Sequence, residues 1–438
     1  MIPINAFELY ESNVRSYCRS FSDVFLKAKD DVIYSETGKK YIDFFAGAGA
    51  LNYGHNNDYI KEQLLTYIND DGLTHGLDMY TVAKRKFVTK FVERILKPRE
   101  LEYKLQFCGA TGTNAVEAAL KLARKVKKRT NIFSFMGAFH GMSLGSLSTT
   151  SNKSSREGAG MPLNQVTFMP HPFGLMNHFD TIQYIESILL DDHSGIEKPA
   201  AIIFETVQAE GGVNPVSEQW LRRLADLCKR HDILLICDDI QVGCGRTGTF
   251  FSFERAGIVP DMVTLSKSIS GYGLPMSLLL LKPELDEWKP GEHNGTFRGN
   301  QMAFVTACAA LELREKLDLD NIVMRNERFI QSYLEKNIGT ISEKIEIRGL
   351  GMIWGIDLSK IGDSALSKKI VLDCFDKGLI LERAGREDSV VKLLPPLTIT
   401  ADHLERGCEI LSEVMHSNIV GCEIASHHNV GGEYFGRK

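Results

Sequence analysis

Strand-length apolar runs alternate with amphipathic segments through the middle of the chain. The apolar runs cover residues 132–135, 201–204, 233–238 and 262–265, as expected for strands buried on both faces of a sheet. The segments that follow Thr113 and Ser217 repeat apolar residues at helical spacing, and both residues are preferred helix N-caps. Strands that alternate with helices predict an α/β fold with a mostly parallel sheet covered on both faces.

The pattern changes near residue 320. Residues 349–357 form an apolar run punctuated by glycines, which predicts one strand. Residues 367–377 predict a helix, and residues 390–394 predict a further strand that ends before two prolines. This part of the chain therefore predicts a smaller α+β unit. The last stretch, from residue 420 to 438, has weak periodicity and predicts a loosely ordered tail.

Composition places the chain among ordinary globular proteins. It has 438 residues, of which 43% are hydrophobic and 24% charged, so we expect two or three domains. The net charge of -5 argues against a nucleic-acid surface, and no apolar run reaches the length of a membrane span. We see no signal peptide and no paired cysteine spacing among the nine cysteines, so we expect a cytoplasmic protein with reduced thiols and no metal site.

Two charged residues lie at the ends of apolar strands, where an isolated ion is strongly disfavoured. Asp238 ends one run, and Lys267 follows the next run, ahead of a glycine-containing turn. A carboxylate can hold a heteroaromatic nitrogen protonated, while a desolvated lysine amine attacks a carbonyl carbon on the same ring. The pair therefore predicts pyridoxal 5'-phosphate (PLP) as cofactor, with Gln241 near the phenolic oxygen of its ring. Taken alone, Lys267 fits a surface lysine equally well.

Two loops that precede Asp238 and Lys267 in the sequence could bind the same cofactor, and each also has a purely structural explanation. Gly112 and Thr113 open a helix whose free N–H groups suit a phosphate, although a simple helix cap is the commoner case. Phe139 follows the strand at residues 132–135 and could cover one face of the ring. The alternative is a core phenylalanine beside an ordinary loop histidine, His140.

Three further polar residues are candidates for the site. Thr296 lies in a small-polar turn, which either donates a hydroxyl to phosphate or is a plain loop. Glu205 and Glu210 follow the strand at residues 201–204, and their carboxylates face either the pocket or solvent. The order of all these pieces along the chain is more specific than any one of them.

This order of motifs resembles the class III (ω-amino acid) aminotransferases, which are PLP enzymes of fold type I. The resemblance runs from about residue 21 to residue 400. It rests on Thr111-Gly112-Thr113, Phe139-His140-Gly141, residues 205–212, Asp238-Asp239-Ile240-Gln241, Gly245-Arg246-Thr247-Gly248, Ser266-Lys267, Gly295-Thr296-Phe297 and Pro395-Pro396-Leu397.

The resemblance implies a large domain with a seven-stranded, mostly parallel sheet and a smaller α+β domain built from both ends of the chain. The expected bounds are 1–60 for the N-terminal segment of the small domain and 61–315 for the large PLP-binding domain. Residues 316–420 would form the C-terminal part of the small domain, and residues 421–438 the tail.

Carried over residue by residue, the resemblance implies a role for each motif. Lys267 would bind the cofactor covalently and then move the proton, and Asp238 would pair with the ring nitrogen. Gln241 would contact the phenolic oxygen. Ile240 would pack on one face of the ring and Phe139 on the other.

The phosphate site and the assembly follow from the same resemblance. Gly112 and Thr113 would hold the phosphate, and Thr296 of the partner subunit would complete that cup. A homodimer or a homotetramer with active sites at the subunit interface is implied. The small-molecule partners would be an amino donor and an oxo acceptor.

Within the family, several stretches are similar to the group of diaminobutyrate–2-oxoglutarate transaminases. These enzymes supply 2,4-diaminobutyrate for ectoine and related products. The stretches are residues 45–57, 74–78, 268–275, 289–299 and 391–397. The similarity implies amino transfer from glutamate to aspartate 4-semialdehyde, which gives 2-oxoglutarate and L-2,4-diaminobutyrate.

Four positions depart from the wider family. Asp239 replaces the usual glutamate, Ala209 a glycine and Asn114 a frequent glutamate. Lys392 stands where many members carry an arginine for a substrate carboxylate, and lysine cannot make the bidentate fork. Together with Glu205 and Glu210, the candidate substrate residues are therefore Lys392 and Arg19, with Arg298 as a further alternative.

These departures keep other functions open. One is transfer from a different terminal amine, such as ornithine, 4-aminobutyrate, a β-amino acid or taurine. Another is an aminomutase, which would move nitrogen within one molecule without turning over 2-oxoglutarate. A regulatory PLP-binding protein is disfavoured, because the first ~40 residues are too short and insufficiently basic for a DNA-binding segment.

Overall fold

A seven-stranded sheet forms the centre of the protein. The computed structural model describes residues 5–173, 179–362 and 364–430. The strands lie in the order β4-β12-β11-β10-β7-β5-β6. Their bounds are β4 Lys104–Phe107, β5 Ile132–Phe135, β6 Val166–Met169, β7 Ala201–Phe204, β10 Leu234–Asp238, β11 Met262–Leu265 and β12 Leu278–Leu281.

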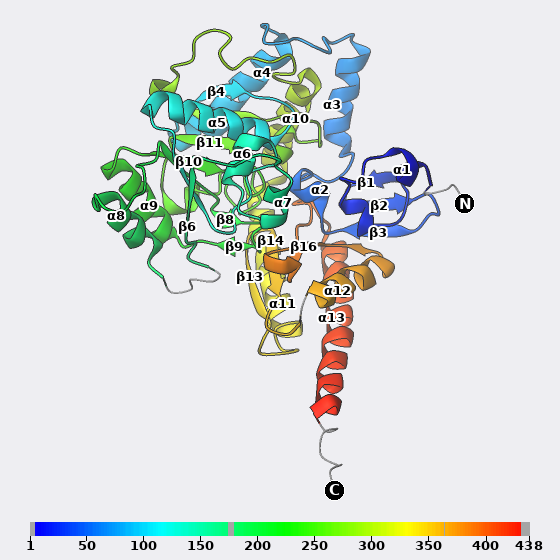
Figure 1. Cartoon of the computed structure of the whole chain (residues 1–438). Helices are drawn as coiled ribbons and strands as arrows, with labels where there is room; N and C mark the ends of the chain where they lie inside the picture. The colour runs from blue at the N-terminus through cyan, green and yellow to red at the C-terminus, as the bar shows by residue number, and fades with distance from the viewer. Residues whose placement is uncertain (1–4, 174–178, 363, 431–438) are drawn as a thin grey trace.

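The pairing confirms the predicted α/β fold with a mostly parallel sheet. Strands β6, β5, β7, β10 and β11 run parallel, and β12 is antiparallel to both of its neighbours, β11 and β4. The helices are α1 Asn5–Tyr10, α2 Ala46–Gly49, α3 Asp58–Asn69, α4 Val82–Phe91, α5 Gly112–Lys127, α6 Leu144–Thr149, α7 Lys153–Glu157, α8 Thr181–Leu190, α9 Glu218–Arg230, α10 Gln301–Leu317, α11 Leu319–Asn337, α12 Ser364–Asp376 and α13 Ala401–Val430. The chain has helices around this sheet and others that lie away from it, such as α12 and α13 in Figure 1.

Helices cover both faces of the sheet because its strands are apolar on both sides. In β10, Ile236 belongs to the buried cluster that includes the apolar side of α5. Its neighbours Leu235 and Cys237 belong to the cluster that includes Leu224 of α9. Successive strand residues thus point to opposite helical layers, which explains why the strands read as continuous apolar runs.

The two ends of the chain meet in smaller sheets. Strands β1 Phe25–Lys29, β2 Val32–Ser35 and β3 Lys40–Asp43 form a sheet with β15 Leu379–Ile380, in which β15 runs parallel to β3. A second sheet has the order β13-β14-β17-β16, and a short ribbon joins β8 Val207–Gln208 to β9 Asn214–Pro215. The pairing of β3 with β15 joins the two chain segments expected to form the small domain. The bounds of the domains stay a proposal.

One strand prediction is wrong. Residues 349–357 do not form a single strand but belong to a hairpin of β13 Glu346–Leu350 and β14 Ile353–Asp357. Gly351 in the turn has a φ of +59°, and a Cβ there would lie 2.3 Å from the carbonyl oxygen of Arg246. Gly351 therefore lies in a tight turn that approaches the backbone of Arg246 closely, and it does not lie inside one continuous strand.

The remaining C-terminal elements follow the expected order with shifted ends. The helix predicted for residues 367–377 is α12, which begins at Ser364, and it precedes β16 Glu382–Ala384 and β17 Val390–Leu393. Helix α13 continues to Val430, where the sequence predicted a loose tail from residue 420, and residues 431–438 lie outside the described part. Within the described residues, no helix combines the length and apolarity needed to span a membrane.

The guanidinium of Arg246 connects several segments in the interior. Arg246 is completely buried, in the loop after β10. It donates to the carbonyl oxygen of Met352 at 3.0 Å, to that of Pro395, and to Asn52 Oδ1 at 2.6 Å. Burial lowers its pKa to about 9. The residue thus joins the loop after β10 to the β13–β14 turn, the segment after β17 and the N-terminal part of the chain.

Candidate active site

A pocket lies at the carboxyl ends of β7, β10 and β11, where binding sites form in open α/β sheets. Its cavity volume is about 150 Å³. Nine of the predicted residues line it: Gly112, Thr113, Phe139, Glu205, Glu210, Asp238, Ile240, Gln241 and Lys267. The lining includes no other lysine among the described residues.

Asp238 is fixed at the end of β10 by bonds to both carboxylate oxygens. Oδ1 accepts from the Thr264 hydroxyl and from the backbone N–H of Ile240, each at 3.2 Å. Oδ2 lies 2.7 Å from Nδ1 of His140. The side chain is only 5% exposed. These contacts hold the carboxylate in one orientation at the pocket, as a partner for a protonated ring nitrogen requires.

His140 is a site residue that the sequence left as an ordinary loop histidine. It is buried, and its Nε2 accepts or donates no hydrogen bond within the described residues. Burial alone would lower the pKa of His140, but the hydrogen bond and charge of Asp238 outweigh it and raise the pKa. The His140 ring, which also lines the pocket, therefore holds the Asp238 carboxylate in place.

This raised pKa gives a prediction for the variant His140→Asn, which can keep a donor toward Asp238 but cannot be charged. Because the folded protein binds the proton more tightly than an unfolded histidine of pKa 6.5, the charge of His140 stabilises the fold below that pH. The contribution is lost as the pH rises through the folded pKa. We expect the stability advantage of the wild type over the variant to shrink as the pH rises above about 6.5, as measured by urea unfolding. An advantage that is constant or grows with pH would contradict a charged His140.

Lys267 begins a short 3₁₀ helix, Lys267–Ser270, directly after β11. Its φ is +51°, a left-handed conformation that costs energy for a residue with a side chain. Burial lowers the pKa of the Lys267 amine, although the charge of Glu210 opposes that change. A lowered pKa leaves a larger fraction as the free amine, which is the nucleophilic form.

The start of α5 offers an anion site beside this amine. Gly112 is the first residue of the helix, and a Cβ there would lie 2.8 Å from Ile240 Cδ1, so a larger residue would have to displace the Ile240 side chain. The Thr113 hydroxyl lies 2.6 Å from Ser143 Oγ. Asn114, one of the departures from the family, accepts the backbone N–H of the N-cap Thr111 at 3.2 Å. Asn114 thus takes a capping role, and the first turn of α5 suits a phosphate.

Glu205 supports the wall of the pocket near Phe139. Its two carboxylate oxygens accept the backbone N–H groups of Phe139 at 3.1 Å and Ala209 at 3.3 Å. Burial raises the pKa of Glu205 to about 7. The residue therefore orders the loop that carries Phe139, and Phe139 and Ile240 supply apolar walls to the same pocket.

Lys392 lies just beyond the pocket lining, in a cluster of charges. It is completely buried on β17, with Nζ 2.7 Å from Glu210 Oε1 and 2.9 Å from Glu382 Oε2. Gln241 donates its amide protons to Glu210 Oε1 and to the carbonyl oxygen of Ala48, both at 3.0 Å. The ammonium of Lys392 therefore already holds two carboxylates, and a substrate carboxylate could reach it only by displacing one of them.

The other candidate residues lie away from the pocket lining. Arg19 is exposed, and its guanidinium donates to the carbonyl oxygens of Arg15 and Asn13. Thr296 is exposed in its turn, so its place in a partner's phosphate cup remains a prediction. The guanidinium of Arg298 bonds the carbonyl oxygen of Asn294 at 3.4 Å.

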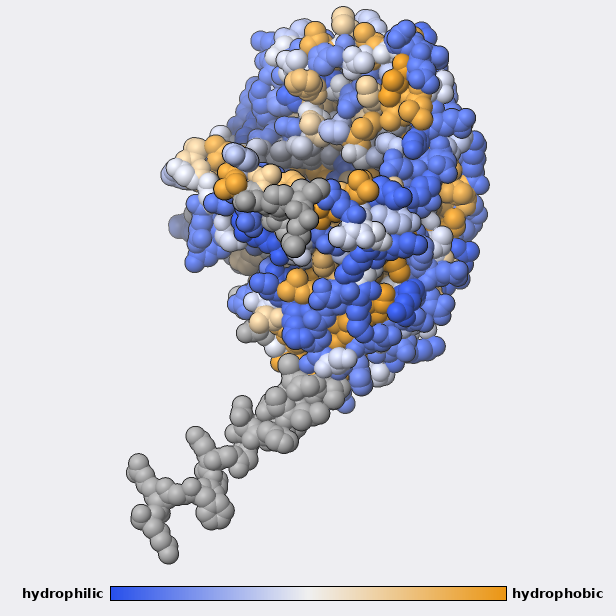
Figure 2. Space-filling view, turned by 90° about the vertical axis from the view of Figure 1, so that its right-hand side faces the viewer, coloured by the Kyte–Doolittle hydropathy of each residue, from blue (hydrophilic) through white to orange (hydrophobic). Residues whose placement is uncertain are grey.

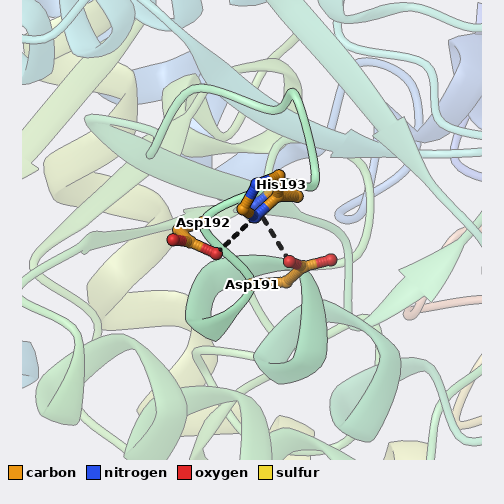
Figure 3. Close-up of side chains that lie close together, drawn as sticks. All are labelled: Asp191, Asp192 and His193. Atoms are coloured by element: carbon orange, nitrogen blue, oxygen red, sulfur yellow. Dashed lines mark hydrogen bonds and ion pairs between the residues drawn. The ribbon is translucent and has the colours of Figure 1, made fainter.

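An acidic cluster after α8 does not form part of this site. Asp191, Asp192 and His193 lie close together and are exposed, and Figure 3 shows their side chains. The bonds drawn there are internal to the cluster, from the His193 backbone N–H to Asp191 and between the His193 ring and Asp192. We assign no ligand to it.

The pocket fits PLP on several independent features. One space is surrounded by a lysine amine, a buried carboxylate, a helix N-terminus that begins at a glycine, and two apolar walls. Each corresponds to one part of the cofactor: the aldehyde carbon, the ring nitrogen, the phosphate and the ring faces. The fold and the site thus define a PLP-dependent enzyme of fold type I.

The comparison with protein families gives the particular class. The model of the class III aminotransferases matches residues 18–415. The chain belongs to this family and is a PLP-dependent transaminase. A diaminobutyrate–2-oxoglutarate transaminase of Halalkalibacterium halodurans is 53% identical over 411 residues, which cover 94% of this chain and 96% of that protein. One of Streptomyces avermitilis is 54% identical over 423 residues, covering 94% and 97%.

Solved structures of more distant sequence share the fold. An ornithine aminotransferase of Toxoplasma gondii, with PLP at partial occupancy in its active site, superposes with a TM-score of 0.83 at 23% identity. The match covers 95% of this chain and 94% of that one. An S-selective transaminase of Arthrobacter has a TM-score of 0.85 at 20% identity, covering 95% and 98%.

Proposed function

We propose that this enzyme transfers the amino group of glutamate to the aldehyde carbon of aspartate 4-semialdehyde, giving 2-oxoglutarate and L-2,4-diaminobutyrate. The observation that carries the proposal is identity above 50% to relatives named diaminobutyrate–2-oxoglutarate transaminase, along more than nine-tenths of the chain. The pocket supports it, because every cofactor-facing residue expected from one subunit lines the same space.

The chain's own residues suggest how the reaction proceeds. When bound, PLP supplies an electron sink for the electrons released at the substrate carbon that bears the amine. Lys267 removes the proton from that carbon and returns one in the other half-reaction, because its amine is partly unprotonated in the pocket. Asp238, oriented by His140 and Thr264, keeps the ring nitrogen protonated. Phe139 and Ile240 confine the ring and exclude water.

A homodimer or homotetramer is part of this proposal. Several large apolar side chains are exposed around the segment between α3 and α4 and on the loop that carries Thr296. Figure 2 shows apolar groups gathered on the upper part of one face, where α3 lies in Figure 1. The exposed apolar side chains of this segment and this loop include Leu65, Leu73, Leu77, Met79, Tyr80, Val82 and Phe297. Exposed apolar surface of this kind suits a second copy of the chain, whose Thr296 would then reach the phosphate.

A cytoplasmic location and a role in ectoine supply complete the proposal. The eight cysteines of the described residues are free thiols, and most are buried, which suits a reducing compartment. The chemistry of the site by itself constrains the reaction that precedes this one. What the site requires is a reaction that supplies an amino acid with an aldehyde at its fourth carbon.

Incubation of the purified enzyme with glutamate and aspartate 4-semialdehyde tests the reaction. We expect L-2,4-diaminobutyrate and 2-oxoglutarate in equal amounts, with nitrogen from labelled glutamate in the product. Ornithine, 4-aminobutyrate, a β-amino acid and taurine serve as competing donors with 2-oxoglutarate. Failure to form diaminobutyrate, together with faster turnover of one of these donors, would contradict the proposed substrate. An isomer of aspartate 4-semialdehyde that keeps its own nitrogen, formed without 2-oxoglutarate, would instead indicate an aminomutase.

A further inference from the structure

Glu382 was not singled out by the sequence, and the structure places it in the charge cluster beside the pocket. We propose that Glu382 determines substrate specificity by giving this cluster a negative charge that recognises the non-reacting ammonium group of diaminobutyrate. The inference rests on the proposed function and adds a residue to it.

The position of Glu382 is fixed by the sheet. Glu382 on β16 and Lys392 on β17 are direct cross-strand partners in an antiparallel pair. Their side chains meet at 2.9 Å, and the Glu382 side chain is 11% exposed. That contact occupies Oε2 of Glu382, and this oxygen is buried. Because the strand register places Glu382 opposite Lys392, the two side chains stay in contact as long as β16 and β17 are paired.

The cluster carries more negative than positive charge. Glu210 and Glu382 both approach the single ammonium of Lys392, which leaves one carboxylate charge in excess when both acids are ionised. Burial raises the pKa of Glu382 to about 6 although Lys392 opposes that rise, as expected for a charge that is not fully compensated. Partial burial and the charge of Glu382 also raise the pKa of Tyr17 to about 12. Desolvation is the largest cause of both shifts, and the neighbouring carboxylate charges add to it.

The cluster also lies within electrostatic reach of the reacting amine. Glu210 lines the pocket together with Lys267, and the charges of Glu210, Lys392 and Glu382 all act on the amine of Lys267. In L-2,4-diaminobutyrate, the two nitrogens are joined through three carbon atoms. A substrate whose terminal amine reacts near Lys267 can bring its second ammonium toward this cluster, where the excess carboxylate charge attracts it.

The comparison of two donors isolates this effect. L-2,4-diaminobutyrate and 4-aminobutyrate share the reacting amine, the chain length and the carboxylate, and they differ only in the second ammonium. We expect the wild type to prefer diaminobutyrate when 2-oxoglutarate is the acceptor. In Glu382→Gln the ratio of the two kcat/KM values should fall about tenfold, since the excess negative charge of the cluster is lost. The change should come from a higher KM for diaminobutyrate, with kcat largely retained.

Two further variants separate charge from packing. Glu382→Asp keeps the charge and should keep most of the preference, while the exposed Glu387→Gln in the same hairpin should behave as the wild type. Glu382→Ala gives a second neutral variant if the glutamine protein does not fold. A neutral variant that keeps the wild-type ratio, or an aspartate variant that loses it equally, would overturn the role of Glu382. Failure of the proposed function is distinct, since the wild type itself would then not turn over diaminobutyrate.

Discussion

Replacing Lys267 by alanine is expected to lower kcat for amino transfer by about 10³- to 10⁴-fold. Lys267 is the only lysine among the described residues that line the pocket, and burial lowers the pKa of its amine. Without it, no other lining side chain supplies a free amine to move the proton at the substrate carbon. The measurement is the single-turnover rate of the cofactor absorbance change after mixing with glutamate, followed by quantification of 2-oxoglutarate.

The matched control for this experiment is Lys153→Ala. The Lys153 side chain is 91% exposed, and its ion pair with Glu157 in α7 is long at 3.9 Å. This variant should keep the wild-type rate. A Lys267→Ala protein that is folded and transfers amino groups within tenfold of the wild-type rate would rule out Lys267 as the proton-moving group.

Replacing Arg246 by methionine should destabilise the protein by about 3–5 kcal/mol. The methionine matches much of the buried volume but leaves the carbonyl oxygens of Met352 and Pro395 and the amide of Asn52 without their donor. Each buried group that loses its partner has an unfavourable desolvation free energy. The contacts between segments from distant parts of the chain are therefore weakened. Urea unfolding monitored by tryptophan fluorescence would show the lower midpoint.

Arg406→Met provides the comparison on the surface. The Arg406 side chain is 53% exposed on α13, where it pairs with Glu409 at 2.8 Å. Exposed pairs of this kind contribute roughly 0–1 kcal/mol, so the midpoint should hardly move. Equal effects of the two substitutions would contradict the role of Arg246 as a buried connection between segments.

The sequence predicted the inner strands β5, β7, β10 and β11 because they are buried on both faces. A strand such as β10, with helices on either side, is apolar from Leu234 to Cys237, and this leaves an unbroken run that is easy to recognise. The hairpin of β13 and β14 was misread as one strand for a related reason. Its turn consists of Gly351 and Met352, which are as apolar as the flanking strands, so no polar residue marks the change of direction.

The parts of the site that the sequence missed are those made by long-range packing. His140 and Asp238 are 98 residues apart, and nothing near either residue indicates that they meet. Glu382 follows an apolar strand in the same way as many surface glutamates, and only the pairing of β16 with β17 places it opposite Lys392. Lys392 itself was singled out, but its two carboxylate partners became visible only in three dimensions.

The pairing of β3 with β15 has a consequence for how the protein is made. Ile42 emerges early from the ribosome, whereas its partner Leu379 is synthesised almost at the end of the chain. Until then the outer edge of β3 has unpaired backbone groups, which can pair with other unfinished chains. A prematurely terminated polypeptide would never cover that edge. An unfinished chain that ends before Leu379 therefore leaves exposed a strand edge that the complete chain covers.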